Sequence, residues 1–546
     1  MGLITRQRRI TLLLMLFLLC GFFLILKLFS IQILQSPSLT AGSIHQRMVT
    51  YQLDSGRGDI LDREGIPLTG VSRDILIAFP FLITDSSQVK EELSGIFSRE
   101  ELEKIEEKIQ TTSDKKAVLI APTENVILTQ GRADKIKQKE IPGIILSQEN
   151  LRFSPDNPAV HLVGQLDRQT GAGVSGIELM FQKELKSVGP ELLAVFLDGM
   201  DRVLPGLGYR HISPKESMSP LHVKLTIDSP VQSIVEEKMD RYIERGTVVV
   251  MEPKNGDILA MASRDKPPRN DLNYALQNFF PASVFKVVVA AAALEKGDFT
   301  MNSQFTCSGS IEVGSNTVDC PHGPHGEITL SEALAYSCNP AFVEIGLEIG
   351  GSSIIEYAQK LGFSERTGLY PYPHEERETK SGKLPDYDEL LSPAGISNAV
   401  LGQHQVKATP LQIAQLFSTI ANDGRMVSPR VVMELTTSRG VAVQKFSQDR
   451  GRVALLPSTA KQLKRMMIGV TRFGTGRAAS VQGYVTAGKT GTTDGDGYSW
   501  FAGFTPVEYP EAVVVVYIEK SKQERNNAAF VYGEIMDEIL KLKRDI

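Results

Sequence analysis

The chain has 546 residues, a length that predicts roughly three to four domains of about 150 residues each. Its 59 Lys and Arg residues against 64 Asp and Glu residues give a formal net charge of −5, which argues against a nucleic-acid-binding protein. The 42% hydrophobic content argues against a disordered chain, and four cysteines are too few for a disulfide-stapled scaffold. The sequence therefore predicts mostly folded domains of the soluble type.

The N-terminal segment departs from this composition. Ile10–Leu26 has no charged residue, and Leu28–Leu34 continues the apolar run after Lys27, whose side chain can snorkel to a membrane surface. Three arginines precede the run: Arg6, Arg8 and Arg9. A cleaved signal peptide has an apolar region of about 7–15 residues and a small-residue cleavage site, and neither fits. By the positive-inside rule we expect a single-pass anchor over residues 10–34, with residues 1–9 cytoplasmic and the remainder extracytoplasmic.

Residues 35–219 are predicted to form an elongated, mixed pedestal domain of the dimerisation-like kind, with no obvious chemistry. Arg57–Gly65 favours two short strands around a polar turn. Ser98–Gln110 has the pattern of an amphipathic helix, because Ser98 and Glu101 have capping-box spacing and apolar residues recur behind them.

Residues 220–546 are predicted to form an α+β domain. Gly246–Met251 and Asp257–Ala262 flank a turn-forming Pro-Lys-Asn-Gly sequence, which predicts a hairpin. A helical stretch follows, and then come three strand-like runs and a last helix: Tyr484–Thr493, Tyr498–Phe504, Ala512–Glu519 and Ala529–Leu542. Two strands, then helices, then three strands predict one five-stranded antiparallel sheet packed against helices.

The first chemical motif is Pro281-Ala-Ser-Val-Phe-Lys286, which opens an apolar run that ends at Gly297. A proline at the start and a glycine at the end are typical of a helix, here with Ser283 in its first turn. Lys286 shares the face of Ser283, and apolar surroundings lower the pKa of a lysine toward that of a general base for the serine hydroxyl. The same spacing recurs at Ser87, Ser113, Ser263 and Ser458, so the helix start and the apolar run single out this copy.

The second motif, Ser337-Cys-Asn339, is the only Ser-x-Asn in the chain. It follows a predicted helix that Thr329 caps, and Pro340 is expected to hold Asn339 outside helical geometry. We therefore expect the hydroxyl of Ser337 and the amide of Asn339 to face a cleft from a tight turn. An ordinary polar turn is the alternative.

The third motif lies in Val485–Thr493, where glycines stand on both sides of Lys489. Strand alternation places Lys489 and Gly491 on one face, with Thr490 and Thr492 on the other. Glycines let a ligand approach the backbone closely, and an ammonium group with hydroxyls and edge amides suits a carboxylate. A plain edge strand rich in Gly and Thr is the alternative.

Together, Ser-x-x-Lys, Ser-x-Asn and Lys-Thr-Gly on a helix start, a turn and a strand resemble the motifs of penicillin-binding proteins and serine β-lactamases. Further segments resemble class B penicillin-binding proteins: Arg57–Gly65, His161–Gly164, Gly173–Glu178, Leu225–Asp228, Gly402–Gln403, Thr409–Gln412 and Trp500–Phe504. These segments extend the resemblance along most of the chain.

The resemblance implies a membrane-anchored peptidoglycan D,D-transpeptidase that cross-links stem peptides and is acylated by β-lactams. Ser283 would be the nucleophile and Lys286 its base, while Ser337 and Lys489 would pass the proton to the leaving D-Ala. The backbone N–H groups of Ser283 and Thr492 would form the oxyanion hole. Substrate binding would fall to Asn339, Thr490, Gly491 and Thr492. The resemblance implies no metal, no organic cofactor and no nucleic acid, and it implies a polytopic membrane glycosyltransferase as partner.

Three positions depart from the family's pattern without removing a catalytic group. Ala282 and His404 stand where the family has glycine, and Val284 stands where it has threonine. A β-lactamase shares all three motifs, but the anchor and the long region before residue 220 argue against one. The intact Ser283 argues against a dead scaffold and leaves a β-lactam sensor open. The motifs do not distinguish cell elongation from division or sporulation.

Three cysteines lie beyond the predicted anchor: Cys307, Cys320 and Cys338. Cys338 is the middle residue of the Ser-x-Asn motif, in a compartment that permits disulfides. Free thiols in a structural loop are the favoured interpretation. A redox switch, in which Cys338 pairs with Cys320 or Cys307 and distorts the turn, is the sharper hypothesis. A metal site from Cys320, His322 and His325 is the third, and its spacing matches no common zinc pattern.

Overall fold

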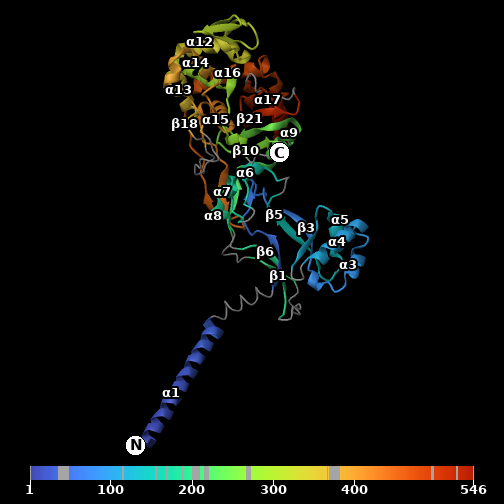
Figure 1. Ribbon diagram of the computed structural model, residues 1–546. Coiled ribbons are helices and arrows are strands. Elements are labelled where there is room, and N and C mark those ends of the chain that lie inside the picture. Colours follow the sequence, from blue (N-terminus) through green and yellow to red (C-terminus); the bar gives the residue numbers. More distant parts are fainter. Residues whose placement is uncertain are drawn as a thin grey trace. The chain divides into compact units, whose positions relative to one another are not determined.

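The computed structural model describes residues 2–34, 48–112, 116–139, 141–153, 157–167, 170–186, 189–198, 209–213, 220–265, 272–365, 367, 381–492, 497–523 and 527–544. The chain divides into two compact units (Figure 1). Unit 1 comprises Met1–Gly56, Ser72–Arg152 and Val188–Met218; unit 2 comprises Arg57–Val71, Phe153–Ser187 and Ser219–Ile546. The units interleave along the chain. The predicted boundary between residues 219 and 220 adjoins residues 214–219, which lie outside the described ranges, and it stays a prediction.

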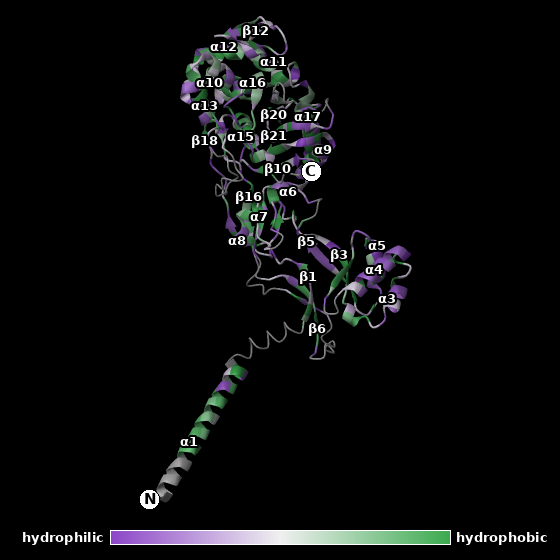
Figure 2. Ribbon diagram, viewed as in Figure 1, coloured by the Kyte–Doolittle hydropathy of each residue, from purple (hydrophilic) through white to green (hydrophobic). Residues whose placement is uncertain are grey.

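Unit 1 begins with an apolar helix. Helix α1 (Gly2–Phe29) continues into the π-helical turn η1 (Ser30–Leu34). Its segment Leu12–Ile33 is long and apolar enough to cross a membrane, and none of it is buried against the protein (Figure 2). An apolar helix without a protein partner requires an apolar environment. Among the described residues it is the one helix with these properties.

Within its described residues, the remainder of unit 1 combines two three-stranded sheets with three α-helices. The sheets have the orders β1-β6-β7 and β4-β3-β5, with β1 Met48–Asp54, β6 Glu191–Phe196, β7 Tyr209–Ile212, β4 Val118–Ala121, β3 Val71–Ala78 and β5 Ile144–Leu151. The helices are α3 (Ser86–Leu93), α4 (Arg99–Thr111) and α5 (Gln130–Lys137). Helix α4 confirms the predicted amphipathic helix, because Ser98 and Glu101 make both bonds of a capping box.

Unit 2 is built on the predicted five-stranded antiparallel sheet, in the order β10-β9-β21-β20-β19. Its strands are β9 (Ile243–Met251), β10 (Ile258–Asp265), β19 (Ala487–Thr492), β20 (Ser499–Thr505) and β21 (Ala512–Ser521). The first two come from one end of the unit and the last three from the other, as expected from the sequence. Strand β19, which carries the Lys-Thr-Gly motif, lies at the edge.

Helices cover both faces of this sheet. Helix α15 (Pro410–Ala421) packs against one face, and α9 (Ser229–Tyr242) and α17 (Ala528–Arg544) pack against the other (Figure 1). Along β21, Val513 and Val515 belong to the core that contains α15, while Val514 and Val516 belong to the core that contains α17. Because both faces are buried, the strands have continuous valine runs instead of alternating apolar and polar residues.

The other elements of unit 2 surround this core. The helices are α6 (Val160–Val163), α7 (Gly176–Met180), α8 (Gln182–Leu185), α10 (Lys286–Lys296), α11 (Leu330–Tyr336), α12 (Asn339–Ile349), α13 (Gly351–Lys360), α14 (Pro393–Val400) and α16 (Pro457–Arg472). A second sheet has the order β17-β16-β8-β2, with β17 Ala442–Lys445, β16 Val432–Thr436, β8 His222–Leu225 and β2 Ile60–Leu61. Three strand pairs complete the unit: β11 (Gln304–Cys307) with β14 (Gly326–Thr329), β12 (Ser310–Val313) with β13 (Asn316–Asp319), and β15 (Arg425–Met426) with β18 (Arg452–Val453).

The segment Arg57–Gly65 is attached to unit 2 by a buried ion pair. Arg57 Nε lies 2.7 Å from a carboxylate oxygen of Glu178, and both side chains are almost fully buried. A buried charge that loses its partner destabilises a fold by about 3–5 kcal/mol, so this pair holds the two segments together. The prediction of two strands around a polar turn in Arg57–Gly65 is confirmed for the strand before the turn, Ile60–Leu61, and wrong for the second strand, because only an isolated bridge between Leu61 and Pro67 follows the turn.

Candidate active site

The nucleophile motif forms a short 3₁₀ turn that leads directly into a helix. The turn η5 (Ala282–Phe285) contains Ser283, and α10 begins at Lys286 and ends before Gly297, which has the left-handed φ of 79°. The predicted helix is therefore confirmed from Lys286 onward, with Ser283 in the 3₁₀ turn ahead of it. Ser283 is half-buried, whereas Lys286 is completely buried.

Lys286 is held by the Ser-x-Asn turn. Its Nζ donates to the backbone oxygen of Ser337 at 2.7 Å and to Oδ1 of Asn339 at 2.6 Å, and it lies 3.4 Å from the Ser337 hydroxyl. Burial lowers the pKa of Lys286 to about 7, although the nearby thiols of Cys338 and Cys320 act in the opposite direction. A lysine with such a pKa can accept a proton near neutral pH.

The Ser-x-Asn motif lies between α11 and α12. Ser337 ends α11 in the left-handed conformation, with φ 57°, and the Thr329–Glu332 capping box begins that helix as predicted. Asn339 is the first residue of α12, so the expectation that Pro340 keeps it outside the helix is wrong. Pro340 occupies the first helical turn, where its missing N–H has no intrahelical partner to lose.

The Lys-Thr-Gly strand brings a second buried lysine to the same hydroxyl. Lys489 Nζ lies 2.9 Å from Ser337 Oγ and 3.0 Å from the backbone oxygen of Thr490. Burial lowers the pKa of Lys489 well below its ordinary value, and the charge of Lys286 lowers it further. Among the described residues neither lysine has an ion-pair partner. The Ser337 hydroxyl therefore bridges two buried lysines whose pKa values both lie well below the ordinary value for lysine.

Two glycines let neighbouring segments approach Ser283. A Cβ atom on Gly491 would lie 2.9 Å from the backbone oxygen of Pro281 and 3.0 Å from Val284 Cγ2. A Cβ on Gly402 would lie 2.3 Å from the backbone oxygen of Ala282. Both distances are too short for a side chain, so β19 and the segment at Gly402 contact the nucleophile turn through bare backbone. The role of Gly491 in the site is therefore to let β19 come this close to the turn, because it has no side chain.

The three motifs thus converge on one site. The family model described as "Penicillin binding protein transpeptidase domain" matches residues 246–541, more than half of the chain. The chain belongs to the class B penicillin-binding proteins. Stage V sporulation protein D of Bacillus subtilis is 28% identical over 519 residues, which cover 89% of this chain and 77% of that protein. Penicillin-binding protein PbpB of Mycolicibacterium smegmatis is 26% identical over 578 residues, covering 94% and 87%.

Solved structures share the fold of this class B penicillin-binding protein. The D,D-transpeptidase domain of a peptidoglycan glycosyltransferase from Eggerthella lenta has a TM-score of 0.63 at 22% identity, covering 90% of this chain and 99% of that one. Penicillin binding protein 3 from Mycobacterium tuberculosis, in complex with aztreonam, also has a TM-score of 0.63, at 20% identity, covering 91% and 97%.

Two departures from the family's pattern fall on left-handed backbone. Ala282 has φ 48° and His404 has φ 55°, and these are positions where the family has glycine. A side chain in this conformation costs roughly 1–2 kcal/mol, which glycine avoids. The backbone next to Ser283 therefore keeps its conformation here at some cost in stability.

Two further residues support the site and were not predicted from the sequence. Thr475 Oγ1 lies 2.6 Å from Thr490 Oγ1, and the backbone oxygen of Asp319 accepts a bond from Asn339 Nδ2 at 2.8 Å. Thr475 stands between Gly474 and Gly476, a flanking pattern like that of the Lys-Thr-Gly strand, and this is the signal that could have found it. Asp319 acts through its backbone, so its residue type carries no signal.

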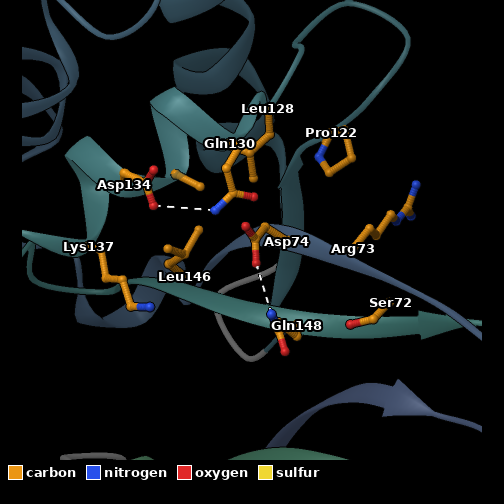
Figure 3. A pocket seen from close by; sticks show the side chains of 11 residues that line it. Ser72, Arg73, Asp74, Pro122, Leu128, Gln130, Asp134, Lys137, Leu146 and Gln148 are labelled. Carbon is orange, nitrogen blue, oxygen red and sulfur yellow. Dashed lines mark hydrogen bonds between the residues drawn. The ribbon is translucent and has the colours of Figure 1, made fainter.

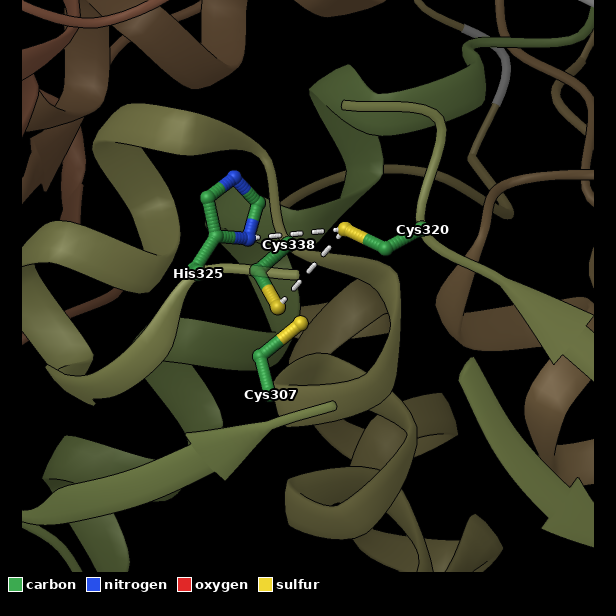
Figure 4. A group of neighbouring side chains, drawn as sticks. All are labelled: Cys307, Cys320, His325 and Cys338. Atoms are coloured by element: carbon green, nitrogen blue, oxygen red, sulfur yellow. Dashed lines mark hydrogen bonds between the residues drawn. The ribbon is translucent and has the colours of Figure 1, made fainter. Parts of the chain in front are cut away.

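Residues Cys307, Cys320 and Cys338 also converge, together with His325 (Figure 4). His322, the other histidine considered from the sequence, is exposed and lies outside this group. All three cysteines are free and buried.

A separate hollow of about 360 Å³ lies in unit 1 and holds none of the predicted site residues (Figure 3). Part of its polar lining is paired: Gln130 donates to Asp134 at 3.3 Å, and Gln148 donates to Asp74 at 3.4 Å. Figure 3 shows no hydrogen bond from the Ser72 hydroxyl to Asp74 or Lys137, so this hollow lacks the paired nucleophile and base of a catalytic site.

We predict that Gly491→Ala destabilises unit 2 by about 1–3 kcal/mol, because the new methyl group forces β19 away from the nucleophile turn. Chemical unfolding followed by fluorescence measures this change. The matched control is Gly131→Ala in α5, where a Cβ meets no atom within 4 Å, and this variant should not destabilise the protein. Unchanged stability of Gly491→Ala would show that β19 does not need this close approach.

Proposed function

We propose that this chain is a membrane-anchored peptidoglycan D,D-transpeptidase that works through a serine acyl-enzyme. The observation that carries the proposal is the pair of buried lysines on the Ser337 hydroxyl, next to the turn that presents Ser283. Relatives named as peptidoglycan D,D-transpeptidases support the reaction, among them PbpA of Mycolicibacterium smegmatis, 30% identical over 338 residues. The solved relative that holds aztreonam, a β-lactam, supports acylation by this class of compound.

In the proposed first half-reaction, the Ser283 hydroxyl attacks the carbonyl carbon of the D-Ala-D-Ala amide. Lys286, with its pKa near 7, takes the hydroxyl proton. The backbone N–H groups of Ser283 and Thr492 stabilise the negative charge on the carbonyl oxygen. The C–N bond then breaks, leaving the acyl group on Ser283, and the departing D-Ala nitrogen receives a proton.

The proton reaches the leaving group through Ser337. Its hydroxyl contacts Lys286 on one side and Lys489 on the other, so a proton taken up at Lys286 has a hydrogen-bonded route across the site. An amine from a neighbouring stem peptide then attacks the acyl-enzyme, and the same route runs in reverse. The amide of Asn339 holds the stem-peptide backbone, while Lys489, Thr490 and Thr492 receive the terminal carboxylate.

We predict that fluorescent penicillin labels the wild-type protein covalently and that Ser283→Ala abolishes labelling. The matched control is Ser458→Ala, because Ser458 and Lys461 repeat the Ser-x-x-Lys spacing at the exposed start of α16, and this variant should label normally. Slow loss of the label fits a transpeptidase, whereas rapid loss indicates a β-lactamase. D-Ala release from a stem peptide plus an acceptor amine separates a transpeptidase from a sensor, which releases none.

We predict that the acylation rate rises with pH through about 7, the pKa of Lys286. Below this value Lys286 is protonated and cannot accept the Ser283 proton, so the rate falls about tenfold for each pH unit. Above it the rate reaches a plateau. The measurement is the second-order rate constant of penicillin labelling over about two pH units on each side. A rate that is flat across this range would remove Lys286 as the base.

We further propose that α1 anchors the chain with its N-terminus in the cytoplasm and unit 2 outside. The three arginines before the apolar run favour this orientation. Protease added to intact protoplasts should digest unit 2, and protection of unit 2 would reverse the orientation.

We also propose that a polytopic glycosyltransferase is the partner of this chain in the membrane. When this chain is crosslinked in its own membranes and then purified, the crosslinked product should contain that glycosyltransferase.

A further inference from the structure

Four metal-binding side chains meet beside the catalytic turn: Cys307, Cys320, His325 and Cys338 (Figure 4). Their three sulfur atoms and one imidazole nitrogen all lie within 4.8 Å of one another. The three cysteines are buried, with exposed fractions of 1%, 6% and 0% in chain order. The proposed transpeptidation uses none of these four groups.

The spacing of these atoms fits the corners of a tetrahedron around one ion. With zinc–sulfur bonds of about 2.3 Å and zinc–nitrogen bonds of about 2.0–2.1 Å, the edges of a tetrahedron are about 3.8 Å between sulfurs and about 3.6 Å between sulfur and nitrogen. The Cys320 and Cys338 sulfurs are 4.0 Å apart, and the Cys320 sulfur lies 3.5 Å from His325 Nδ1. Small side-chain adjustments would bring all four atoms to bonding distance.

Neighbouring groups favour the thiolate form of two of the cysteines and orient the histidine ring. The backbone N–H groups of His325 and Gly309 act on the Cys307 sulfur, and that of Ala341 acts on the Cys338 sulfur, in the direction that favours the thiolate. The His325 ring stacks on Tyr336 with centroids 5.2 Å apart and planes 10° apart, which fixes its orientation. Outer contacts of this kind orient the first set of ligands.

We propose that Cys307, Cys320, His325 and Cys338 bind one Zn²⁺ ion in a closed, structural site. Three thiolates and one imidazole in tetrahedral arrangement are a typical zinc set, and four protein ligands leave no position for water or substrate. This inference goes beyond the proposed transpeptidase activity, and metal content can be measured whether or not that activity is found.

The ion would tie an otherwise weakly held region to the active site. Cys307 ends β11, His325 precedes β14, and Cys320 follows β13, so three ligands come from two-stranded pairs, which are marginal on their own. Cys338 lies at the start of α12. Zinc would therefore join these strands to the helix, and the binding energy would contribute to folding.

The same ion would also position the residues that contact Lys286, through two of its cysteine ligands. Cys338 lies between Ser337 and Asn339, which hold Lys286 Nζ, and Cys320 follows Asp319, whose backbone oxygen holds the Asn339 amide. Fixing the two cysteines fixes both ends of this hydrogen-bond chain. Zinc would thus act on acylation through the geometry of the Ser-x-Asn turn, and not by contact with substrate.

A disulfide between these cysteines is the competing hypothesis. It would use two thiols and leave the third cysteine and His325 without a role, whereas zinc accounts for all four groups. Intact-mass measurement without reductant separates the two, because a disulfide removes two hydrogens from the chain and zinc binding leaves all thiols alkylatable after chelation.

The first test is elemental analysis of the full chain purified in detergent without added metal. We expect about one zinc per chain. Cys307→Ser and His325→Gln should lose the zinc, while His322→Ala, the matched control three residues from His325, should retain it. Absence of zinc, stoichiometric binding of another metal, or a disulfide among these cysteines would each overturn the proposal.

The second test follows the consequences of metal removal in the wild-type chain, which avoids variants that fail to fold. Chelation should lower the melting temperature and slow penicillin acylation at least about tenfold, mainly in the covalent step and less in initial binding. Added Zn²⁺ should restore both, while Mg²⁺ should not. Unchanged melting and acylation after complete zinc loss would overturn the positioning role.

Discussion

The active site depends on the burial of two lysine side chains around one hydroxyl. Lys286 and Lys489 are both completely buried and both contact Ser337 Oγ, at 3.4 and 2.9 Å. Two ammonium groups in this position would repel each other in an environment of low dielectric constant, so at least one lysine is favoured in its neutral form. The fold thus lowers the pKa of a lysine to near neutral pH without a histidine or a carboxylate.

This arrangement requires a rigid frame, and the five-stranded sheet supplies it. Strand β19 carries Lys489 at the sheet edge, and β20 and β21 behind it are covered by helices on both faces. The apolar run of α10 buries Lys286 in the same core. The hydrophobic core therefore determines both where the lysines lie and how far their pKa values fall.

Close approach of backbones is the second requirement. Gly491 and Gly402 contact the turn that carries Ser283 at distances that admit no side chain, and Ala282 adopts a left-handed backbone beside Ser283. The turn is therefore held by its neighbours and not by its own conformational preference. A zinc ion bound by Cys307, Cys320, His325 and Cys338, as we propose, would give the Ser-x-Asn turn a further support.

The sequence by itself determined the elements with strong local signals and the family's motifs. The apolar N-terminal helix, the capping boxes at Ser98 and Thr329, and the five strands of the sheet follow from hydrophobic pattern and capping, which act over short distances. The candidate catalytic residues could be named because three motifs occur together in a fixed order, and the structure brings these motifs together in one place. Only the tertiary structure decided the remainder. The Arg57–Glu178 ion pair, the role of the Asp319 backbone and the meeting of Cys307 with His325 join residues whose spacing in the chain matches no motif. Such contacts depend on how whole elements pack, and no local pattern records that packing.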